Sequence, residues 1–291
     1  MSTIALGVTN LTRTAKLKSL LESVPRDLID RAIIADNGEI GELERELYNR
    51  DWGFEITVLD LPYNSGIGFC RRQIADELQE NYLLMLDNDM VVDKNINKLY
   101  SILESIPEFG GVSGILLEDG ILRGPGVNYH AKTIFGDRVL YIHNYEVNYP
   151  VKVESNPVFE FDQIPQAGII RKECLETYKW DEDYETSREH CDFFVGQKKN
   201  GDWRFGVTPS VIITHNPGGS DEYMDIKNET IQDHKRFIEK WEYDYVIYGD
   251  PNWLVTVGGL EPSSTIKKAY NNMPIEIQLC IKRIYRKFNP L

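Results

Sequence analysis

The sequence is poor in the residues that characterise disulfide-rich, disordered and membrane-spanning proteins. Its 291 residues include only 4 cysteines, 22 glycines and 13 prolines, and the cysteines form no C-x-x-C pair. This spacing argues against a structural zinc site and favours a reducing compartment. No apolar run reaches the roughly 18 residues that a transmembrane helix requires, and the first ten residues lack the features of a secretion signal. We therefore expect a folded cytoplasmic protein, with any membrane contact peripheral and at the cytoplasmic face.

Basic residues are scarce as well, at 32 against 46 acidic residues, which gives a net charge of −14. A nucleic-acid binder needs a basic face, so we expect no nucleic-acid partner. The exception is the segment after residue 264, where six basic residues and one acidic residue give about +5 and leave about −19 elsewhere. Within it, Ile275–Phe288 predicts a basic amphipathic helix, which can lie on an anionic membrane surface. Packing on its own acidic domain or in a subunit interface is the alternative.

The first third of the chain alternates short β-rich runs with amphipathic segments. The runs are Ile4–Val8, a helix through Leu20, Ala32–Ala35, a helix near Glu42–Tyr48, Phe54–Leu59, a helix over Ile67–Leu78, and Tyr82–Leu86. This order predicts an α/β fold with a mostly parallel central sheet flanked by helices. Ligands of such sheets bind beyond the carboxyl ends of the strands, so the polar residues that follow each strand are candidates for a site.

The rest of the chain is less regular. Residues 110–165 contain shorter runs and many turn residues, which favours antiparallel additions or loops. A mixed segment over Ile169–Tyr178 follows, then a helix over Cys191–Lys199, a strand over Val211–Thr214 that ends at His215, and a helix over Glu222–Trp241.

The apolar run before Asp87-Asn88-Asp89 delivers two carboxylates to a strand end. Alternate residues of an extended strand face the same way, so this pair can hold Mg²⁺ or Mn²⁺, which in turn neutralises a diphosphate. A polar turn after a buried strand is the alternative. The haloacid-dehalogenase-like phosphohydrolases, with Asp87 as nucleophile, share the D-x-D-x-V pattern. Their motif lies on the first strand, however, whereas three β–α units precede it here.

Several motifs, in the right order, resemble the family-2 glycosyltransferases of GT-A fold. They are Ala5–Asn10, like the opening strand that meets the nucleotide; Ile34–Gly38, like V-D-N-x-S; Asn64–Gln73, like N-x-G-x-[AG]-x-[AG]-R-N; Asp87–Asp89, like D-x-D; Gln166–Glu173, like G-[AG]-x-x-x-x-R-[RK]; and Trp180–Tyr184, like F-D-E-x-F. Glu189–Phe193 resembles the E-H-x-D-F form of β-1,4-N-acetylgalactosaminyltransferase-like members, and the similarity spans Ile4 to Trp241.

This resemblance implies a GT-A (nucleotide-diphospho-sugar transferase) fold and a metal-dependent, inverting transfer of a sugar. The donor would be a nucleotide-diphosphate sugar, a UDP-sugar in our expectation, and the acceptor a hydroxyl of a glycan or lipid-linked molecule. A non-catalytic nucleotide-sugar-binding protein is the alternative outside enzymes. We expect residues 1–248 to form the GT-A domain, with a nucleotide-binding half (1–110) and an acceptor half (111–248). Residues 249–291 would form a C-terminal helical extension.

The resemblance also assigns roles to individual residues. Nucleotide contacts fall on Thr9, Asn10, Asp36, Asn64, Gly66, Arg72, Asp87 and Asn88, and ligands for Mn²⁺ or Mg²⁺ on Asp89, Asp87 and His215. Sugar or acceptor contacts fall on Gly168, Trp180, Asp181 and Glu182. An attacking hydroxyl must lose its proton, which needs a nearby carboxylate or imidazole, and Glu189, His190 and Asp192 are the three candidates for this base.

Overall fold

The predicted alternation of strands and helices in the first third is confirmed. The computed structural model describes residues 3–143, 150–218, 231–249, 269–271 and 273–288. Its first elements are β1 (Ile4–Asn10), α1 (Thr14–Ser23), β2 (Arg31–Asp36), α2 (Glu42–Asn49), β3 (Glu55–Asp60), α3 (Ile67–Glu77) and β4 (Tyr82–Met85). The ends of these strands lie within two residues of the predicted positions.

Short strands and hairpins dominate the next part of the chain. The elements are β5 (Met90–Val91), the 3-10 helix η1 (Lys94–Ile96), α4 (Asn97–Ser105), β6 (Phe109–Glu118), β7 (Ile121–Arg123), β8 (Asn128–Ile134), β9 (Asp137–His143), β10 (Val151–Val153), β11 (Asn156–Phe161) and β12 (Gly168–Arg171). The antiparallel additions expected here are present, since β6–β7, β8–β9 and β10–β11 all pair antiparallel.

The last described elements are α5 (Lys172–Thr177), α6 (Glu189–Asn200), β13 (Arg204–His215), α8 (Ile231–Trp241), β14 (Tyr245–Tyr248) and α11 (Ile275–Phe288). The predicted strand ending at His215 and the predicted helix over Ile275–Phe288 are confirmed. The helix predicted from Glu222 is described only from Ile231 onward, because residues 219–230 lie outside the described part of the chain.

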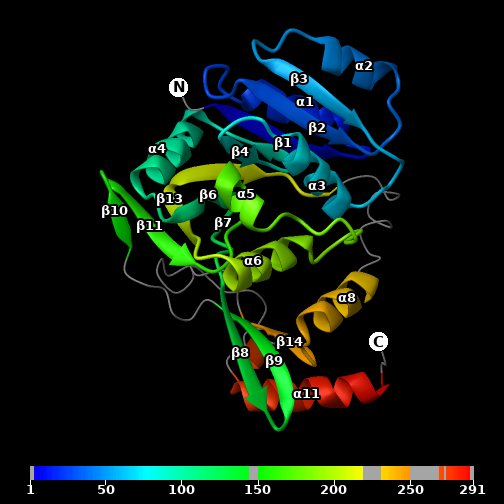
Figure 1. The fold of residues 1–291 in the computed structure, drawn as a ribbon, viewed down its shortest axis with the longest axis vertical. Helices are drawn as coiled ribbons and strands as arrows, with labels where there is room; N and C mark the ends of the chain where they lie inside the picture. The colour runs from blue at the N-terminus through cyan, green and yellow to red at the C-terminus, as the bar shows by residue number, and fades with distance from the viewer. Residues whose placement is uncertain (1–2, 144–149, 219–230, 250–268, 272, 289–291) are drawn as a thin grey trace.

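One large sheet organises the molecule, with strand order β10-β11-β13-β6-β12-β4-β1-β2-β3 (Figure 1). The half formed by β3, β2, β1 and β4 is parallel, as expected. The other half is mixed rather than parallel, because β12 runs antiparallel to both β4 and β6, while β6 and β13 are parallel to each other. Parallel pairing of successive strands needs a crossover segment, usually a helix, whereas the residues described between β6 and β12 form strands and no helix.

The two faces of this sheet are covered by different helices, because successive residues of a strand point to opposite faces. Apolar side chains of α3, α5, α6 and α8 belong to one buried cluster, and those of α1, α2 and α4 belong to another. In β1, for example, Ala5 joins the first cluster, whereas Ile4, Leu6 and Val8 join the second.

A second, three-stranded sheet has the order β14-β9-β8. Its apolar side chains form a small third cluster with Leu279 of α11, so this helix packs on the sheet. In Figure 1 the β8–β9 hairpin reaches away from the large sheet toward α11, which lies across that end of the molecule. Within the described residues, none of the helices combines the length and apolar character needed to cross a bilayer.

Candidate active site

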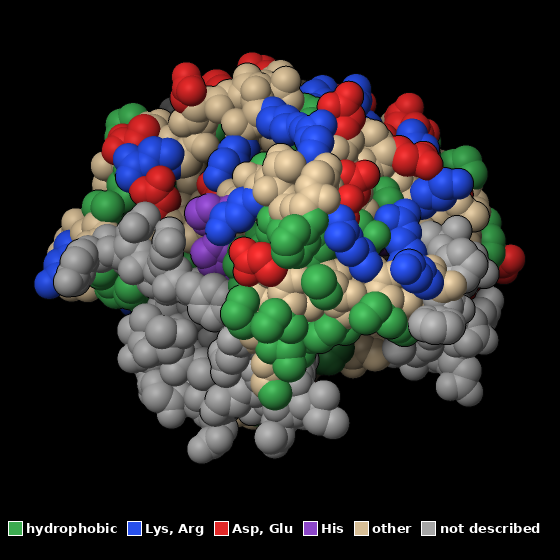
Figure 2. Space-filling view, turned by 90° about the horizontal axis from the view of Figure 1, so that it is seen from below, with side chains coloured by type: hydrophobic (Ala, Val, Ile, Leu, Met, Phe, Trp, Pro, Cys, Tyr) green, Lys and Arg blue, Asp and Glu red, His purple; other side chains and the backbone are tan. Residues whose placement is uncertain are grey.

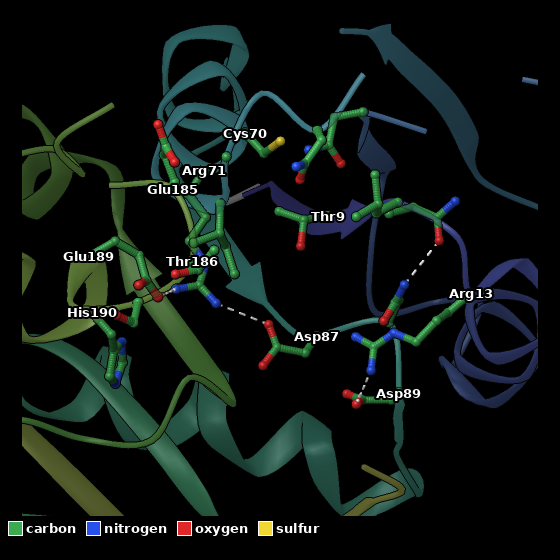
Figure 3. Close-up of a pocket in the computed structure, with 18 of the residues that line it drawn as sticks. Thr9, Arg13, Cys70, Arg71, Asp87, Asp89, Glu185, Thr186, Glu189 and His190 are labelled. Atoms are coloured by element: carbon green, nitrogen blue, oxygen red, sulfur yellow. Dashed lines mark hydrogen bonds and ion pairs between the residues drawn. The ribbon is translucent and has the colours of Figure 1, made fainter. Parts of the chain in front are cut away.

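A cavity of about 500 Å³ lies at the carboxyl ends of β1 and β4 and is closed by the start of α3, the segment 185–188 and the start of α6. Ten of the residues predicted from the sequence line it: Thr9, Asn10, Asn64, Gly66, Asp87, Asn88, Asp89, Glu189, His190 and His215. These residues come from segments as far apart as β1 and β13, and the fold brings them together around one space (Figure 3).

The buried guanidinium of Arg71 joins the two sides of this cavity. Arg71 lies on α3 and is 2% exposed. One of its nitrogens donates to Glu189 at the start of α6, and Nη2 donates to Oδ1 of Asp87 at 3.0 Å (Figure 3). Arg72, assigned to the nucleotide from the sequence, does not line the cavity and instead pairs with Asp76 on the protein surface.

Helix geometry explains why the site takes Arg71 rather than Arg72. Ile67, Cys70 and Arg71 all line the cavity, and their spacing of three and four residues puts them on one face of α3. The predicted helix over 67–78 already places Arg71 on the same face as the apolar Ile67, which lies four residues earlier. It places Arg72 on a different face.

Asp89 is surrounded by positive charge. It is 4% exposed, and Oδ2 accepts a hydrogen bond from Arg13 at 2.6 Å. Nε2 of His215 lies 3.5 Å from Oδ1, and Nδ1 of His215 lies 2.8 Å from Glu118. Although burial opposes ionisation, His215 and Arg13 hold the pKa of Asp89 below its ordinary value. Asp89 in turn raises the pKa of His215, and Glu118 adds to this effect against burial.

A divalent ion fits part of the predicted ligand set. Oδ1 of Asp89 is buried and has no hydrogen-bond donor among the described residues, and it faces the ring of His215. Asp87, the third predicted ligand, is turned to Arg71 instead. No group of three or more His, Cys, Asp or Glu residues in the described ranges is arranged to hold an ion. The pair of Asp89 and His215 therefore provides one carboxylate and one imidazole ligand, and the other ligands of an ion would come from water and a phosphate.

Of the three candidate bases, Asp192 is excluded by its surroundings. Its carboxylate is fully buried and does not line the cavity. It accepts hydrogen bonds from Tyr178 at 2.8 Å, Tyr184 at 3.1 Å, Trp241 at 2.8 Å and Lys240 at 3.0 Å. The prediction of a catalytic role for Asp192 is therefore wrong, because a carboxylate that is surrounded by four donors cannot reach an acceptor. Its role is to fix α6 against α8.

Glu189 and His190 both line the cavity, in different states. Burial, together with the charge of Arg71, lowers the pKa of His190 to about 3, so the imidazole is neutral at physiological pH. Its Nε2 lies 2.8 Å from the carbonyl oxygen of Ile164 and must carry the proton in a neutral ring. Glu189, by contrast, forms an ion pair with the buried guanidinium of Arg71.

The residues predicted to contact the sugar or acceptor lie elsewhere. Trp180 is fully buried and stacks on Phe193 with 4.7 Å between ring centroids, so it has no free face for a sugar. Gly168 is a packing glycine, because a Cβ there would lie 2.5 Å from the carbonyl oxygen of Val112 on β6. Asp181 forms an ion pair with Lys240 outside the cavity.

Glu182 likewise does not line the cavity, and its side chain is exposed to solvent. None of the four expected sugar or acceptor positions therefore lines this cavity, and Trp180 and Gly168 are buried. A tryptophan more often fills a core than binds a sugar, and Trp180 follows that general preference.

Asp36 supports from behind the cavity wall that Asn10 and Asn37 line. It is 1% exposed and does not line the cavity, although its neighbour Asn37 does. Its carboxylate accepts hydrogen bonds from Asn10 at 3.1 Å, from the Tyr48 hydroxyl and from the backbone of Gly38 at 2.8 Å. Asp36 therefore orients Asn10, which is a different role from the direct contact that the sequence suggested.

The wall opposite β1 is the segment 185–188, which the sequence did not identify. It approaches the start of α3 so closely that a Cβ added to Gly66, whose φ is +95°, would lie only 3.0 Å from Cα of Glu185. Asp233 on α8 accepts hydrogen bonds from the backbone nitrogens of Glu185, Thr186 and Ser187 at 2.7–3.1 Å. One carboxylate of α8 thus holds the whole segment in place.

The α/β fold with this mixed sheet is the GT-A fold of glycosyltransferases. The sequence matches no protein-family model, and no curated protein matches it in sequence. Solved structures, however, are similar. S. aureus TarS 1–349 in complex with UDP-GlcNAc is 14% identical, with 75% of this chain and 60% of TarS covered and a TM-score of 0.53.

A second similar structure is GalNAc-T7 with UDP, GalNAc and Mn²⁺, which is 13% identical, with 84% of this chain and 56% of GalNAc-T7 covered and a TM-score of 0.57. Another structure of TarS 1–349 is 14% identical, with 77% and 63% covered and a TM-score of 0.51. This chain therefore spans less than two thirds of each of these proteins. At such low identity, the similarity establishes the fold.

The two adjacent arginines give a direct test of the site. Arg71→Met leaves Glu189 buried without its partner and should lower the free energy of unfolding by about 3–5 kcal/mol. Arg72→Met removes an exposed ion pair and should change it by less than about 0.5 kcal/mol. Urea denaturation of both variants measures the difference. Equal losses would contradict the central role given to Arg71.

His190 should make stability depend on pH. Its pKa is lowered to about 3 in the folded chain, whereas an unfolded histidine titrates near pH 6.5. Below about pH 6.5 the unfolded state binds a proton that the folded state does not. The free energy of unfolding therefore decreases as the pH is lowered. When the pH is lowered from about 7.5 to about 5, the free energy of unfolding of wild type should decrease by about 2 kcal/mol more than that of His190→Gln. An identical pH dependence of the two proteins in urea denaturation would refute this.

Proposed function

We propose that this protein is a metal-dependent, inverting glycosyltransferase that moves a sugar from a UDP-sugar to a hydroxyl group of a glycan or lipid-linked acceptor. The observation that carries the proposal is the convergence of Asp89, Arg71 and Glu189 on one cavity at the strand ends of a GT-A fold. Support also comes from the similar structures, since TarS has been solved with UDP-GlcNAc and GalNAc-T7 with UDP, GalNAc and Mn²⁺.

The nucleotide would bind along the ends of β1 and β2. Thr9, Asn10, Asn37 and Asn64 line this side of the cavity and offer hydroxyl and amide groups rather than charges. Such groups can hydrogen-bond a base and a ribose. The buried Asp36 would keep the Asn10 amide in the orientation that the base requires.

Asp89 and His215 would hold a divalent ion, Mn²⁺ or Mg²⁺. When bound, such an ion neutralises the charge that develops on the departing diphosphate. Arg13 now occupies Oδ2 of Asp89, so this guanidinium would have to release the carboxylate, or share it, when the ion binds. The raised pKa of His215 opposes this binding, because only the neutral imidazole can ligate a metal ion.

Glu189 is the base that we favour. It lines the cavity, and its hydrogen bond from Arg71 fixes its position. His190 is a weaker candidate, because its low pKa makes the imidazole a poor proton acceptor. In the proposed reaction, Glu189 takes the proton of the acceptor hydroxyl. The hydroxyl oxygen bonds to the anomeric carbon as the bond from that carbon to the nucleoside diphosphate breaks. A single displacement of this kind inverts the anomeric centre.

Titration calorimetry with UDP, GDP, CDP and dTDP, each with and without Mn²⁺, tests the donor and the ion together. We expect UDP to bind, and Mn²⁺ to tighten its binding by about ten-fold or more. Asp89→Asn should abolish the effect of Mn²⁺, whereas Asp93→Asn, an exposed carboxylate four residues further along the chain, should preserve it.

The Arg13 side chain supplies a second arm of the same experiment. Arg13→Gln removes the cation that competes for Asp89, so Mn²⁺ alone should bind more tightly than to wild type. Failure of every nucleotide to bind would overturn the transferase proposal, and release of phosphate from simple phosphate esters would then favour the phosphohydrolase.

Glu189→Gln should separate catalysis from binding. The amide keeps the size of the side chain but cannot accept the proton, so turnover of a UDP-sugar, measured as release of UDP, should fall by about 10²–10⁴-fold. The dissociation constant of UDP should stay unchanged. Glu185→Gln, an exposed carboxylate that lines the same cavity, is the matched control and should retain turnover. Full activity of Glu189→Gln would exclude Glu189 as the base.

A further inference from the structure

Exposed apolar side chains concentrate at the end of the molecule formed by α11 and the tip of the β8–β9 hairpin. Among the described residues, Ile277, Ile281, Ile284 and Tyr285 of α11, together with Phe135 at the hairpin tip, are 40–67% exposed. Arg283 of α11 lies over the Phe135 ring and donates to its carbonyl oxygen at 3.2 Å, so helix and tip adjoin. We call these five side chains the apolar corner.

The apolar corner is not the packing face of α11. Gln278 and Leu279 are fully buried against the chain, and Lys282 donates to the carbonyl oxygen of Val246 at 2.6 Å. The exposed side chains at 277, 281, 284 and 285 follow the spacing of one helix face and point the other way. The helix therefore packs one face on the chain, with Leu279 against the small sheet, and presents a separate apolar face to solvent.

Basic side chains border this exposed face. Lys287 is exposed, while Arg283 and Arg286 are half-buried. Arg283 is paired with Asp137 at 2.7 Å, and Arg286 donates to the carbonyl oxygen of Asp244 at 3.0 Å. Figure 2, which views this end of the molecule, shows hydrophobic side chains gathered beside Lys and Arg. Since the chain carries −14 overall, this basic border is an exception to its general charge.

We propose that the apolar corner docks the protein on an anionic lipid surface. Ile277, Ile281 and Ile284 would enter the boundary between headgroups and acyl chains, and Lys287 with its neighbouring arginines would contact the headgroups. The rest of the acidic chain would be repelled by the same surface, which favours contact through this end alone. α11 and the tip of the β8–β9 hairpin also lie together at one end of the molecule (Figure 1).

A second copy of the chain is the competing occupant, and charge disfavours it. A two-fold contact between two α11 helices would place the same basic border on both sides of the interface. Like charges brought together across an interface are repulsive. An anionic lipid surface, by contrast, supplies the opposite charge.

Co-sedimentation of the full chain with vesicles tests the proposal. The vesicles are either phosphatidylcholine alone or phosphatidylcholine with about one third phosphatidylglycerol. Wild type should bind the anionic vesicles, bind the neutral ones more weakly, and be released by high salt. The variant Ile281→Asn/Ile284→Asn should bind about ten-fold less or worse, because two apolar side chains no longer enter the lipid.

Ile231→Asn is the matched control. Ile231 on α8 is 63% exposed, against 58% for Ile284, but it does not belong to the apolar corner. The Ile231→Asn variant should bind vesicles as tightly as wild type does. All variants are first compared by thermal unfolding, so that a loss of fold is distinguished from a loss of binding.

Equal recovery of wild type and the double variant in the supernatant would overturn the proposal. A concentration-dependent dimer of wild type in sedimentation velocity, abolished in the double variant and accompanied by no vesicle binding, would also overturn it and assign the corner to a second copy. The experiment uses neither nucleotide nor acceptor, so its outcome is independent of the proposed transferase activity.

Discussion

A single buried guanidinium holds the two halves of the site at their working separation. Arg71 is bonded to Asp87, which follows the parallel strand β4, and to Glu189, which opens a helix in the second half of the chain. The buried carboxylate of Glu189 and the half-buried carboxylate of Asp87 would repel each other without a cation between them. The fixed, planar geometry of arginine lets it serve both at once, which lysine could not do equally well. The position of the proposed base is therefore set by the strand that carries the acidic motif.

The same principle operates on the other side of the cavity. Asp89 is paired with Arg13 and Asp87 with Arg71, so each carboxylate of the acidic motif has a cation beside it even before any ligand arrives. A cavity in a strongly acidic chain would otherwise repel a diphosphate. Side-chain cations thus prepare the site electrostatically, and any incoming divalent ion competes with charges that the chain already supplies.

How much of this was predictable from the sequence depended on whether the signal was local. The β–α alternation, α11 and the strand end at His215 are local patterns, and each was predicted. Strand β6 was not, because Phe109–Leu116 is buried throughout and shows no polar alternation, while its three glycines weaken the strand signal. Placing β6 at the centre of the sheet depends on pairing with β12 and β13, which are distant in sequence.

The site residues divide in the same way. Residues that follow strands, such as Asn10 and Asp89, were identified because a strand end always reaches the rim of the sheet. Asp192 and Trp180 were misassigned because similarity to a motif does not reveal burial, which is set by the packing of α6 on its neighbours. The contribution of Asp233 could not be predicted from the sequence either, because its partners are backbone nitrogens almost fifty residues earlier in the chain.

That contact of Asp233 has a mechanical consequence. Three consecutive backbone groups of the cavity wall are tied to one side chain of α8, and the same helix is tied to α6 through Lys240 and Asp192. The wall and α8 must therefore shift as one body. The position of α8 therefore sets the width of the cavity on that side. A ligand that prefers a wider or narrower cavity must displace this helix as well.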